Sequence, residues 1–340
     1  MSTPLDALRS PLEICAFCPK LCRFACPVAE AESRETVTPW GLMTHADDLR
    51  RAGSAPGAES AELWSHCTGC DRCRAVCKHQ NPVAETLHTL RAMTEAPHSV
   101  RLWAREAASD PPSWRSLPTA GPIRLMVGRA NAARFSAALR VLSAAGHERL
   151  GRTTTPTAGG RLREVGLMEE YESHRASLLA DLEGVSTVIC LDAEDTVTLR
   201  REHPTGLEVC HVVEAVAGRV KTTNRVFTGD VLYLDACRCG RGLGLYDEPR
   251  AALESLLTGR IIEGLMEREL GGCCGAGSGY AALEPERAAE MAREWASIAP
   301  DVPVIIVGAC ARHLAAALAP RTVWSWIEAL AAGLEREENP

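Results

Sequence analysis

The 340-residue sequence predicts a multidomain protein of the α+β class, in which a small N-terminal helical module precedes two α/β repeats. Three observations lead to this expectation. Eight of the fifteen cysteines lie in two short runs near the N-terminus, a proline-rich segment follows them, and beyond residue 121 short apolar strands alternate with amphipathic helices. We expect the module at 1–95, a linker at 96–121, the first repeat at 122–225 and the second at 226–335.

The two cysteine runs are the strongest functional signal in the chain. They read CAFCPKLCRFACP and CTGCDRCRAVCK, and they contain Cys15, Cys18, Cys22 and Cys26, then Cys67, Cys70, Cys73 and Cys77. A [4Fe–4S] cluster needs four thiolates around it, and close spacing lets one loop supply three of them. The runs therefore predict an α-helical, ferredoxin-like module with two [4Fe–4S] clusters, framed by short helices such as 85–93.

The fourth cysteine of each run is expected to bind the cluster of the other run. One cluster then uses Cys15, Cys18, Cys22 and Cys77, and the other uses Cys67, Cys70, Cys73 and Cys26. The sequence departs from the usual pattern in two places: the first run has one extra residue before its third cysteine, and the second run ends in Lys78 where proline is usual. The crossed assignment is therefore an expectation that the spacing alone does not settle.

Zinc and disulfide bonds are the alternative uses of these cysteines. Structural zinc sites usually take two separated pairs of ligands, which two runs of four do not resemble. Disulfides are disfavoured because the start, MSTPLDALRS, lacks the apolar region of a secretory signal. We therefore expect a reducing, cytoplasmic environment.

Composition excludes some classes of partner. The formal net charge of −7 gives no basic footprint for nucleic acid, and aromatic residues make up only 4% of the chain. No apolar stretch approaches the roughly 20 residues that a transmembrane helix needs. We expect neither a nucleic-acid partner nor a transmembrane segment.

The part beyond the linker predicts two similar α/β units. Apolar strands are expected at 123–127, 186–192, 231–236 and 303–308, and helices at 131–145, 168–182, 249–257, 285–299 and 321–334. Each half then runs strand, helix, loop, helix, strand, helix. This order indicates an internal repeat.

Further cysteines lie at the ends of the second repeat's strands. Cys237 and Cys239 follow one strand, Cys273 and Cys274 lie in LGGCCGAGSGY, and Cys310 follows the last strand. Ligands of open α/β sheets bind at the carboxyl ends of the strands. These thiols are therefore expected to share one pocket.

With these residues in view, the chain resembles the cysteine-rich CCG-domain family. The matching stretches are DACRCGRGLGLYDEPR, GGCCGAGSGY and VGACARHL. The family includes heterodisulfide reductase components and the iron–sulfur subunits of glycolate, lactate and glycerol-3-phosphate dehydrogenases, and the N-terminal module is similar to its usual fusion partner. The resemblance implies an iron–sulfur cluster held by Cys237, Cys273, Cys274 and Cys310.

The family's last cysteine is replaced here. Its C-x-x-C pair is Cys310-Ala-Arg-His313, so His313 and Cys239 are the candidates for the remaining ligand. The alternatives are that His313 is an ordinary residue at a helix start and that Cys239 is a small buried apolar side chain.

The first repeat has a degenerate version of this site. Ala158-Gly159-Gly160 stands where the CCG triplet is expected, and Asp192 and Asp195 stand at the C-x-x-C positions. We interpret the two aspartates as solvated carboxylates, with a hard ion or a partner arginine as alternatives. The resemblance implies that disulfide cleavage needs two such sites, so the loss of one disfavours that chemistry.

These observations favour an iron–sulfur electron-transfer subunit of an oxidoreductase complex. It would relay electrons through two [4Fe–4S] clusters between a dehydrogenase or flavoprotein partner, such as an electron-transfer flavoprotein, and a quinone or second carrier. A thiol/disulfide reductase acting at the C-terminal cysteines, similar to heterodisulfide reductase, is the alternative, and a metal-stabilised scaffold is the third hypothesis. No catalytic residue is assigned, and a third cluster at the C-terminal pocket is left open. A quinone-linked membrane protein as partner would place the chain peripherally at the inner membrane.

Overall fold

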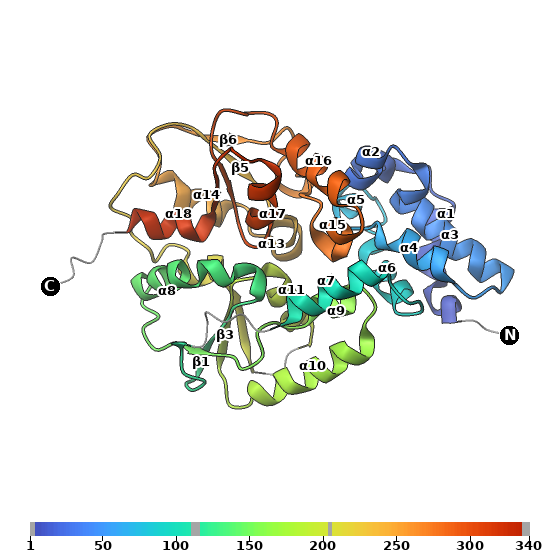
Figure 1. Cartoon of the computed structure of the whole chain (residues 1–340), viewed down its shortest axis with the longest axis horizontal. Helices are drawn as coiled ribbons and strands as arrows, with labels where there is room; N and C mark the ends of the chain where they lie inside the picture. Colours follow the sequence, from blue (N-terminus) through green and yellow to red (C-terminus); the bar gives the residue numbers. More distant parts are fainter. Residues whose placement is uncertain (1–3, 110–115, 203–205, 335–340) are drawn as a thin grey trace.

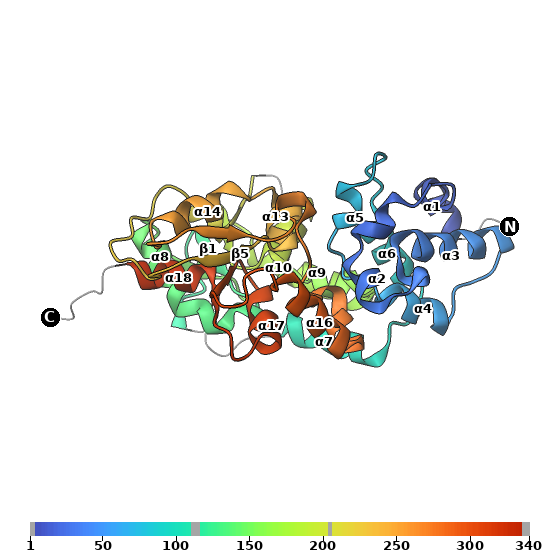
Figure 2. The same cartoon turned by 90° about the horizontal axis from the view of Figure 1, so that it is seen from above.

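The computed structural model describes residues 4–109, 116–202 and 206–334. An N-terminal helical module forms one end of the molecule, and two α/β units form the other, with the C-terminal helix α18 (Trp326–Gly333) farthest from the module (Figures 1 and 2). Within the described ranges, no helix combines the length and apolar character needed to cross a membrane.

The module is built from short helices, and loops with special backbone geometry separate them. Helix α3 has clear end signals: Thr38 Oγ1 accepts a hydrogen bond from Gly41 N at 3.0 Å, Pro39 opens the helix, and Gly53 ends it with a φ of 63°. The elements are η1 Pro4–Leu8, α1 Arg9–Ala16, η2 Leu21–Ala25, α2 Pro27–Glu32, η3 Glu35–Val37, α3 Pro39–Ala52, α4 Ala58–Ser65, α5 Arg72–Ala75 and α6 Val83–Arg91.

The proline-rich segment that was expected to be a linker contains a helix. Helix α7, His98–Ala108, buries Val100 and Ala104 in a small apolar cluster that also contains Tyr171 of the first α/β unit. The expectation of a plain linker over 96–121 is therefore wrong for this stretch. The prolines of the segment all lie outside His98–Ala108, and the apolar spacing within the helix decides its structure.

Both α/β units contain a four-stranded, fully parallel sheet, and the two sheets share one strand order. The first is β2-β1-β3-β4 and the second β6-β5-β7-β8. In register, Ile123 of β1 lies opposite Thr187 of β3, and Leu232 of β5 lies opposite Val304 of β7. The matching order is what an internal repeat predicts at the level of topology.

The elements of the first unit follow in chain order. They are β1 Ile123–Met126, η5 Arg129–Arg134, α8 Phe135–Ala144, β2 Gly151–Arg152, α9 Gly160–Glu164, α10 Met168–Asp181, β3 Thr187–Cys190, α11 Ala193–Glu202, β4 Glu208–His211 and α12 Val212–Val216. Those of the second unit are β5 Val231–Leu234, α13 Cys237–Leu243, α14 Asp247–Glu254, β6 Ile261–Glu263, η6 Arg268–Leu270, η7 Gly277–Gly279, α15 Tyr280–Leu283, α16 Pro285–Trp295, β7 Val304–Ile306, α17 Cys310–Ala317, β8 Val323–Ser325 and α18.

The four strands expected from apolar runs are present as β1, β3, β5 and β7, whereas the strands beside them, β2, β4, β6 and β8, were not expected. One predicted helix is partly wrong: 321–334 begins as strand β8, and α18 starts only at Trp326. Ser325 and Glu328 form a capping box that fixes this start. The four unexpected strands are the edge strands of the two sheets, and they lack the long apolar runs that indicate the buried central strands.

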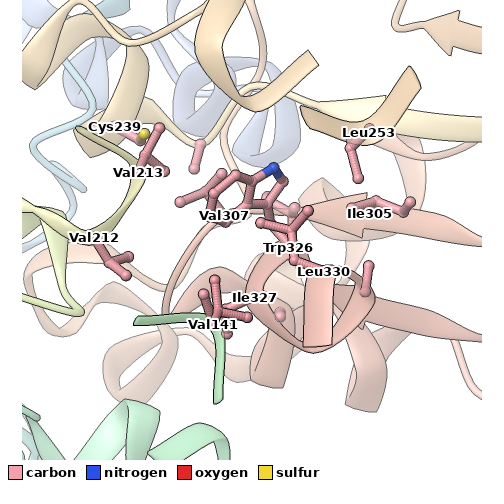
Figure 3. Packing of buried hydrophobic residues seen from close by; sticks show 14 of the residues in the cluster. Val141, Val212, Val213, Cys239, Leu253, Ile305, Val307, Trp326, Ile327 and Leu330 are labelled. Carbon is pink, nitrogen blue, oxygen red and sulfur yellow. The ribbon is translucent and has the colours of Figure 1, made fainter. Parts of the chain in front are cut away.

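One apolar core joins the two α/β units. Figure 3 shows the indole of Trp326 surrounded by Ile305 and Leu330 of the second unit, with Val141 and Val213 of the first unit close by. Trp326 is 1% exposed, and its Nε1 donates to the carbonyl oxygen of Pro249 at 3.0 Å. The halves are therefore held face to face by buried apolar surface, which fixes the carboxyl ends of their strands relative to each other.

Candidate functional site

The cysteines of the N-terminal module form two groups in space. In the first, Cys15, Cys18, Cys22 and Cys77 line a cavity of about 150 Å³ together with Cys73. Burial raises the pKa of the Cys15 thiol to about 12. Asn81 Nδ2 donates to the Cys15 sulfur at 3.0 Å and lowers this pKa, whereas the charges of Cys22, Cys77 and Cys18 raise it.

The second group consists of Cys26, Cys67, Cys70 and Cys73. Burial is the main cause that raises the pKa of Cys73, and the charges of Cys70, Cys67 and Cys26 add to it. Gly69 N donates to the Cys67 sulfur at 3.4 Å. Cys77 thus lies with the first run and Cys26 with the second, and Cys73 borders both groups, so the two groups are neighbours.

The cysteines of the second α/β unit meet at the carboxyl ends of its central strands. Cys237 begins α13 after β5, Cys310 begins α17 after β7, and Cys273 and Cys274 lie in the loop before η7. The Cys273 thiol neighbours the sulfurs of Cys237 and Cys274, and Cys274 also neighbours Cys310. These neighbouring thiols, Cys273 first and then Cys310, lower the pKa of Cys274 well below its usual range.

This site contacts the N-terminal module directly. The Cys273 thiol also neighbours the Cys70 sulfur, and this neighbour is the main cause that lowers the pKa of Cys70. The Cys273 sulfur donates to Thr68 Oγ1 at 3.6 Å. Arg241 spans the contact, donating to the carbonyl oxygens of Cys70 at 2.6 Å and Gly271 at 2.7 Å. The second cysteine group and the C-terminal cysteines are therefore joined through adjacent sulfurs.

The two candidates for the remaining ligand differ in their surroundings. His313 Nε2 lies 3.2 Å from the Ala288 carbonyl oxygen, which only accepts, so Nε2 carries the hydrogen and Nδ1 keeps its lone pair in the neutral ring. His313 and Cys274 line the same cavity. Cys239 is 2% exposed and packs in the apolar core, with its sulfur 3.9 Å from the Leu245 carbonyl oxygen (Figure 3). This environment favours the buried apolar interpretation of Cys239.

A cavity of about 360 Å³ separates the two α/β units next to the C-terminal cysteines. Five cysteines line one wall, and side chains of the first unit line the other; the cysteines are Cys237, Cys239, Cys273, Cys274 and Cys310. On the second wall Arg161 Nη2 donates to Asp192 Oδ2 at 2.7 Å. Away from this lining, Ala158 N donates to Asp195 Oδ1 at 2.7 Å. Of the residues that replace the cysteines in the first unit, Asp192 thus faces the cysteine site.

This arrangement corrects one expectation about the first unit. Asp192 and Asp195 are 6% and 4% exposed, so they are buried carboxylates and not solvated ones. Burial and the charge of Asp192 raise the pKa of Asp195 well above its usual value. An arginine does meet Asp192, but it belongs to the same chain.

A buried ionic cluster, which no sequence pattern indicated, lies where the three parts of the chain meet. Arg238 pairs with Glu164, and its Nε lies 2.8 Å from Glu194 Oε2; the Glu164 backbone oxygen accepts from Arg91 at 2.8 Å. Burial raises the pKa of Glu194 to about 7, although the charge of Arg238 opposes this shift. The charge of Arg238 lowers the pKa of Glu164 to about 2, although burial opposes that shift. Burial thus favours the protonated form of Glu194, whereas Arg238 favours the ionised form of Glu164. The available signal was that Arg238 directly follows the site residue Cys237.

The thiols fit iron–sulfur centres by the chemistry of their donor sets. Each group supplies sulfur ligands almost exclusively, which iron–sulfur clusters require. Backbone amides and Asn81 donate to several of these sulfurs, which is the usual environment of such ligands. Within the described residues, no three histidine, cysteine, aspartate or glutamate side chains are grouped tightly enough to hold a single metal ion.

Comparison with protein families gives two matches. Residues 11–81 match a 4Fe–4S dicluster domain, and residues 231–313 match a cysteine-rich domain, abbreviated CCG. The first range includes all eight cysteines of the module, and the second runs from β5 into α17. Both ranges agree with the two cysteine-bearing parts of the structure.

The chain is also similar to known oxidoreductase components. It is 27% identical over 82% of its length to the B component of the fumarate reductase (CoM/CoB) of Methanothermobacter marburgensis, covering 61% of that protein. Over 30% of its length it is 34% identical to EtfAB:quinone oxidoreductase of Syntrophomonas wolfei and 31% identical to the D component of the dihydromethanophenazine:CoB–CoM heterodisulfide reductase of Methanosarcina mazei. It spans 15% and 26% of these two proteins, so it corresponds to part of each relative.

Proposed function

We propose that the chain is an iron–sulfur protein that joins a 4Fe–4S dicluster domain to a cysteine-rich CCG domain, and that it is the electron-transfer subunit of an oxidoreductase complex. In this proposal it relays electrons between a flavoprotein or dehydrogenase partner and a second acceptor. The relatives named above are components of such systems, which supports the assignment.

The observation that carries the proposal is that the thiols of Cys273 and Cys70 are neighbours. Cys70 belongs to the second group of the module and Cys273 to the C-terminal site, so the two sites adjoin through sulfur. Cys73, in turn, borders the first group. The three groups thus form a continuous series, as stepwise transfer of electrons requires.

We assign the ligands by these groups. Cys15, Cys18, Cys22 and Cys77 hold one [4Fe–4S] cluster, and Cys26, Cys67, Cys70 and Cys73 hold the other. A third iron–sulfur centre is held by Cys237, Cys273, Cys274 and Cys310, with His313 Nδ1 as the remaining donor. When bound, each centre supplies one-electron redox chemistry at a potential set by its surroundings.

The chain's own residues set those surroundings. Burial of Cys273 and Cys274, each 3% exposed, keeps water from their sulfurs. Gly275 N, 3.5 Å from the Cys273 sulfur, and Arg241 place positive charge and hydrogen-bond donors beside the thiolates. Donors of this kind stabilise negative charge on sulfur and raise the potential of a centre bound there.

The test is reductive titration of anaerobically purified protein with deazaflavin and light, followed by electron paramagnetic resonance. We expect uptake of at least two electrons per chain and spectra that show spin coupling between neighbouring centres. Cys70→Ser should remove the coupling and lower the uptake, whereas Cys210→Ser, a cysteine outside the three groups, should leave both unchanged. Uptake of no electrons by iron-loaded wild-type protein would refute the proposal.

A second candidate function is reduction of a disulfide at the C-terminal cysteines. The observation that favours it is the adjoining cavity of about 360 Å³, which has space for a small molecule beside Cys274. Steady consumption of a small disulfide by the isolated chain with reduced viologen, abolished by Cys274→Ser, would establish this activity. Electron uptake without disulfide consumption is the result that the electron-transfer proposal expects.

A further inference from the structure

The surface around the first cysteine group carries exposed aromatic rings. Phe17 and Phe24 lie in the first cysteine run and are 74% and 85% exposed, whereas the chain's other two phenylalanines, Phe135 and Phe227, are buried. Phe24 is the most exposed large apolar side chain of the described residues. Two rings held in water beside a redox site are an apolar surface that a partner can cover.

The same surface is basic, although the whole chain is acidic. Residues 14–24 and 72–80, which carry the first group, contain five lysines and arginines and no carboxylate, in a chain with a net charge of −7. Two of the chain's three lysines, Lys20 and Lys78, line the cavity of this group. Exposed positive charge is therefore concentrated around the first group.

Nearby carboxylates neutralise this charge only in part. Glu35 pairs with Arg23 at 3.0 Å and lies 3.9 Å from the Lys20 ammonium, so one carboxylate serves two cations. Lys78 is exposed, and no carboxylate within the described residues forms an ion pair with it. The face formed by Phe17, Lys20, Arg23, Phe24 and Lys78, called the docking face below, thus keeps a positive surplus.

The docking face is also held in place by its own contacts. The Lys20 ammonium lies 3.5 Å from the centre of the Trp40 ring, and the guanidinium carbons of Arg51 and Arg23 lie 5.1 and 5.9 Å from the rings of Phe17 and Phe24. Cation–π contacts of this kind orient both partners. Binding then costs less side-chain entropy than it would on a fully mobile surface.

We propose that the docking face binds an acidic electron-transfer protein, so that the first cysteine group is the end of the series where that partner exchanges electrons. The inference rests on the proposed electron-transfer function and names the partner's surface. Carboxylates of the partner would pair with Lys20, Arg23 and Lys78 around an apolar centre that covers Phe17 and Phe24. The second group contacts the C-terminal site through Cys70. The first group is therefore the one at which we expect an external partner to exchange electrons.

The experiment compares two protein probes of opposite charge. Stopped-flow spectroscopy measures electron transfer from a reduced acidic flavodoxin to the oxidised chain, and from the reduced chain to basic cytochrome c. At low ionic strength, Lys20→Glu/Lys78→Glu should slow the flavodoxin reaction by at least about tenfold and accelerate the cytochrome reaction, because oppositely charged surfaces steer encounter. Phe17→Ser/Phe24→Ser should slow the flavodoxin reaction at all salt concentrations.

The third lysine provides the matched control. Lys221 is exposed and lies outside both cysteine-bearing regions, so Lys221→Glu makes the same charge change and should leave both rates unchanged. Iron content of each variant shows that the centres are retained. The photogenerated deazaflavin radical reduces the centres without docking, so it separates a docking defect from a defect in electron transfer. If the radical failed to reduce the wild-type protein, the electron-transfer function itself would be refuted.

Several results would overturn the docking proposal while leaving that function intact. Equal flavodoxin rates in the wild type and Lys20→Glu/Lys78→Glu would do so, as would equal effects of Lys221→Glu. Self-association of the wild type in sedimentation experiments, lost in the Phe17→Ser/Phe24→Ser variant, would assign the face to a second copy of the chain. Binding to phosphatidylglycerol vesicles, without any effect on flavodoxin, would assign it to a lipid surface.

Discussion

In the second α/β unit the two central strands lead into Cys237 and Cys310, whereas in the first unit β3 leads into the buried carboxylate of Asp192. The sheets nevertheless have the same strand order, and one apolar core includes residues from both units. Strand order depends on buried apolar side chains throughout the unit, while the site depends on a few residues at the strand ends. The site can therefore change from sulfur ligands to an ionic cluster without changing the fold.

The difference also explains how the first unit contributes to the site. Its wall of the cavity holds Arg161, Asp192 and Glu194 opposite the thiols, and Glu194 and Glu164 bind Arg238 from helix α13 of the cysteine site. The first unit thus positions the cysteine site and closes the cavity around it. Four experiments test this division of roles between the two units.

The largest effect is expected at Arg238. Arg238→Met leaves Glu164 and Glu194 buried without their cation and should lower the free energy of unfolding by about 3–5 kcal/mol. Arg260, whose side chain is 87% exposed, is the matched control, and Arg260→Met should change the value by less than about 0.5 kcal/mol. Anaerobic denaturant titration measures both. Equal, small effects would mean that the ionic cluster does not hold the units together.

The next effect concerns pH and Glu194. Its pKa in the folded protein, about 7, is raised above the ordinary 4.5, so its contribution is fully present below pH 4.5 and is lost as pH rises through 7. Glu194→Gln keeps a hydrogen-bond donor toward Glu164 without this titration. Between pH 5 and pH 8 the wild type should lose on the order of 2 kcal/mol relative to the variant. Thermal midpoints measured across this pH range check the prediction. If the midpoints of the wild type and of Glu194→Gln changed in parallel with pH, Glu194 would not be protonated in the folded state.

The contact between the module and the second unit is tested at Gly277. A Cβ at this position would overlap the carbonyl oxygen of Thr68, so Gly277→Ala should cost about 1–3 kcal/mol and weaken spin coupling between the second group and the C-terminal site. A Cβ at Gly229 meets open space, which makes Gly229→Ala the control. Unchanged coupling in Gly277→Ala would contradict the close sulfur contact.

The smallest effect is expected at Cys239. Because its side chain packs in the apolar core, Cys239→Ala should cost about 1 kcal/mol while the iron content stays the same. The comparison is with Cys274→Ser, which should change the iron content. Loss of iron in Cys239→Ala would restore Cys239 as a ligand.

The sequence was sufficient to predict the parts of the molecule that depend on local pattern. The spacing of Cys67, Cys70 and Cys73 predicted a cluster loop, and the apolar runs predicted β1, β3, β5 and β7. The iron–sulfur nature of both cysteine-bearing regions was also predictable, from the cysteine runs and from the resemblance of the C-terminal stretches.

Features that arise from packing between distant segments were not predictable from the sequence. Glu164 lies in no motif, and it becomes important only because Arg238, 74 residues away, reaches it. The burial of Asp192 and Asp195 likewise depends on how distant parts of the chain pack around them, so single-residue polarity gave the wrong expectation. The short strand β8 has no periodic pattern and is stabilised by pairing with β7.

The most direct test of the central claim is the quantity of iron and acid-labile sulfide per chain in protein purified without oxygen. We expect about 12 of each in the wild type, about 8 in Cys274→Ser and about 12 in Asp195→Asn, because only the second unit binds a centre. Circular dichroism would show that both variants are folded. About 8 of each in all three proteins would contradict the claim, since the C-terminal cysteines would then be free thiols.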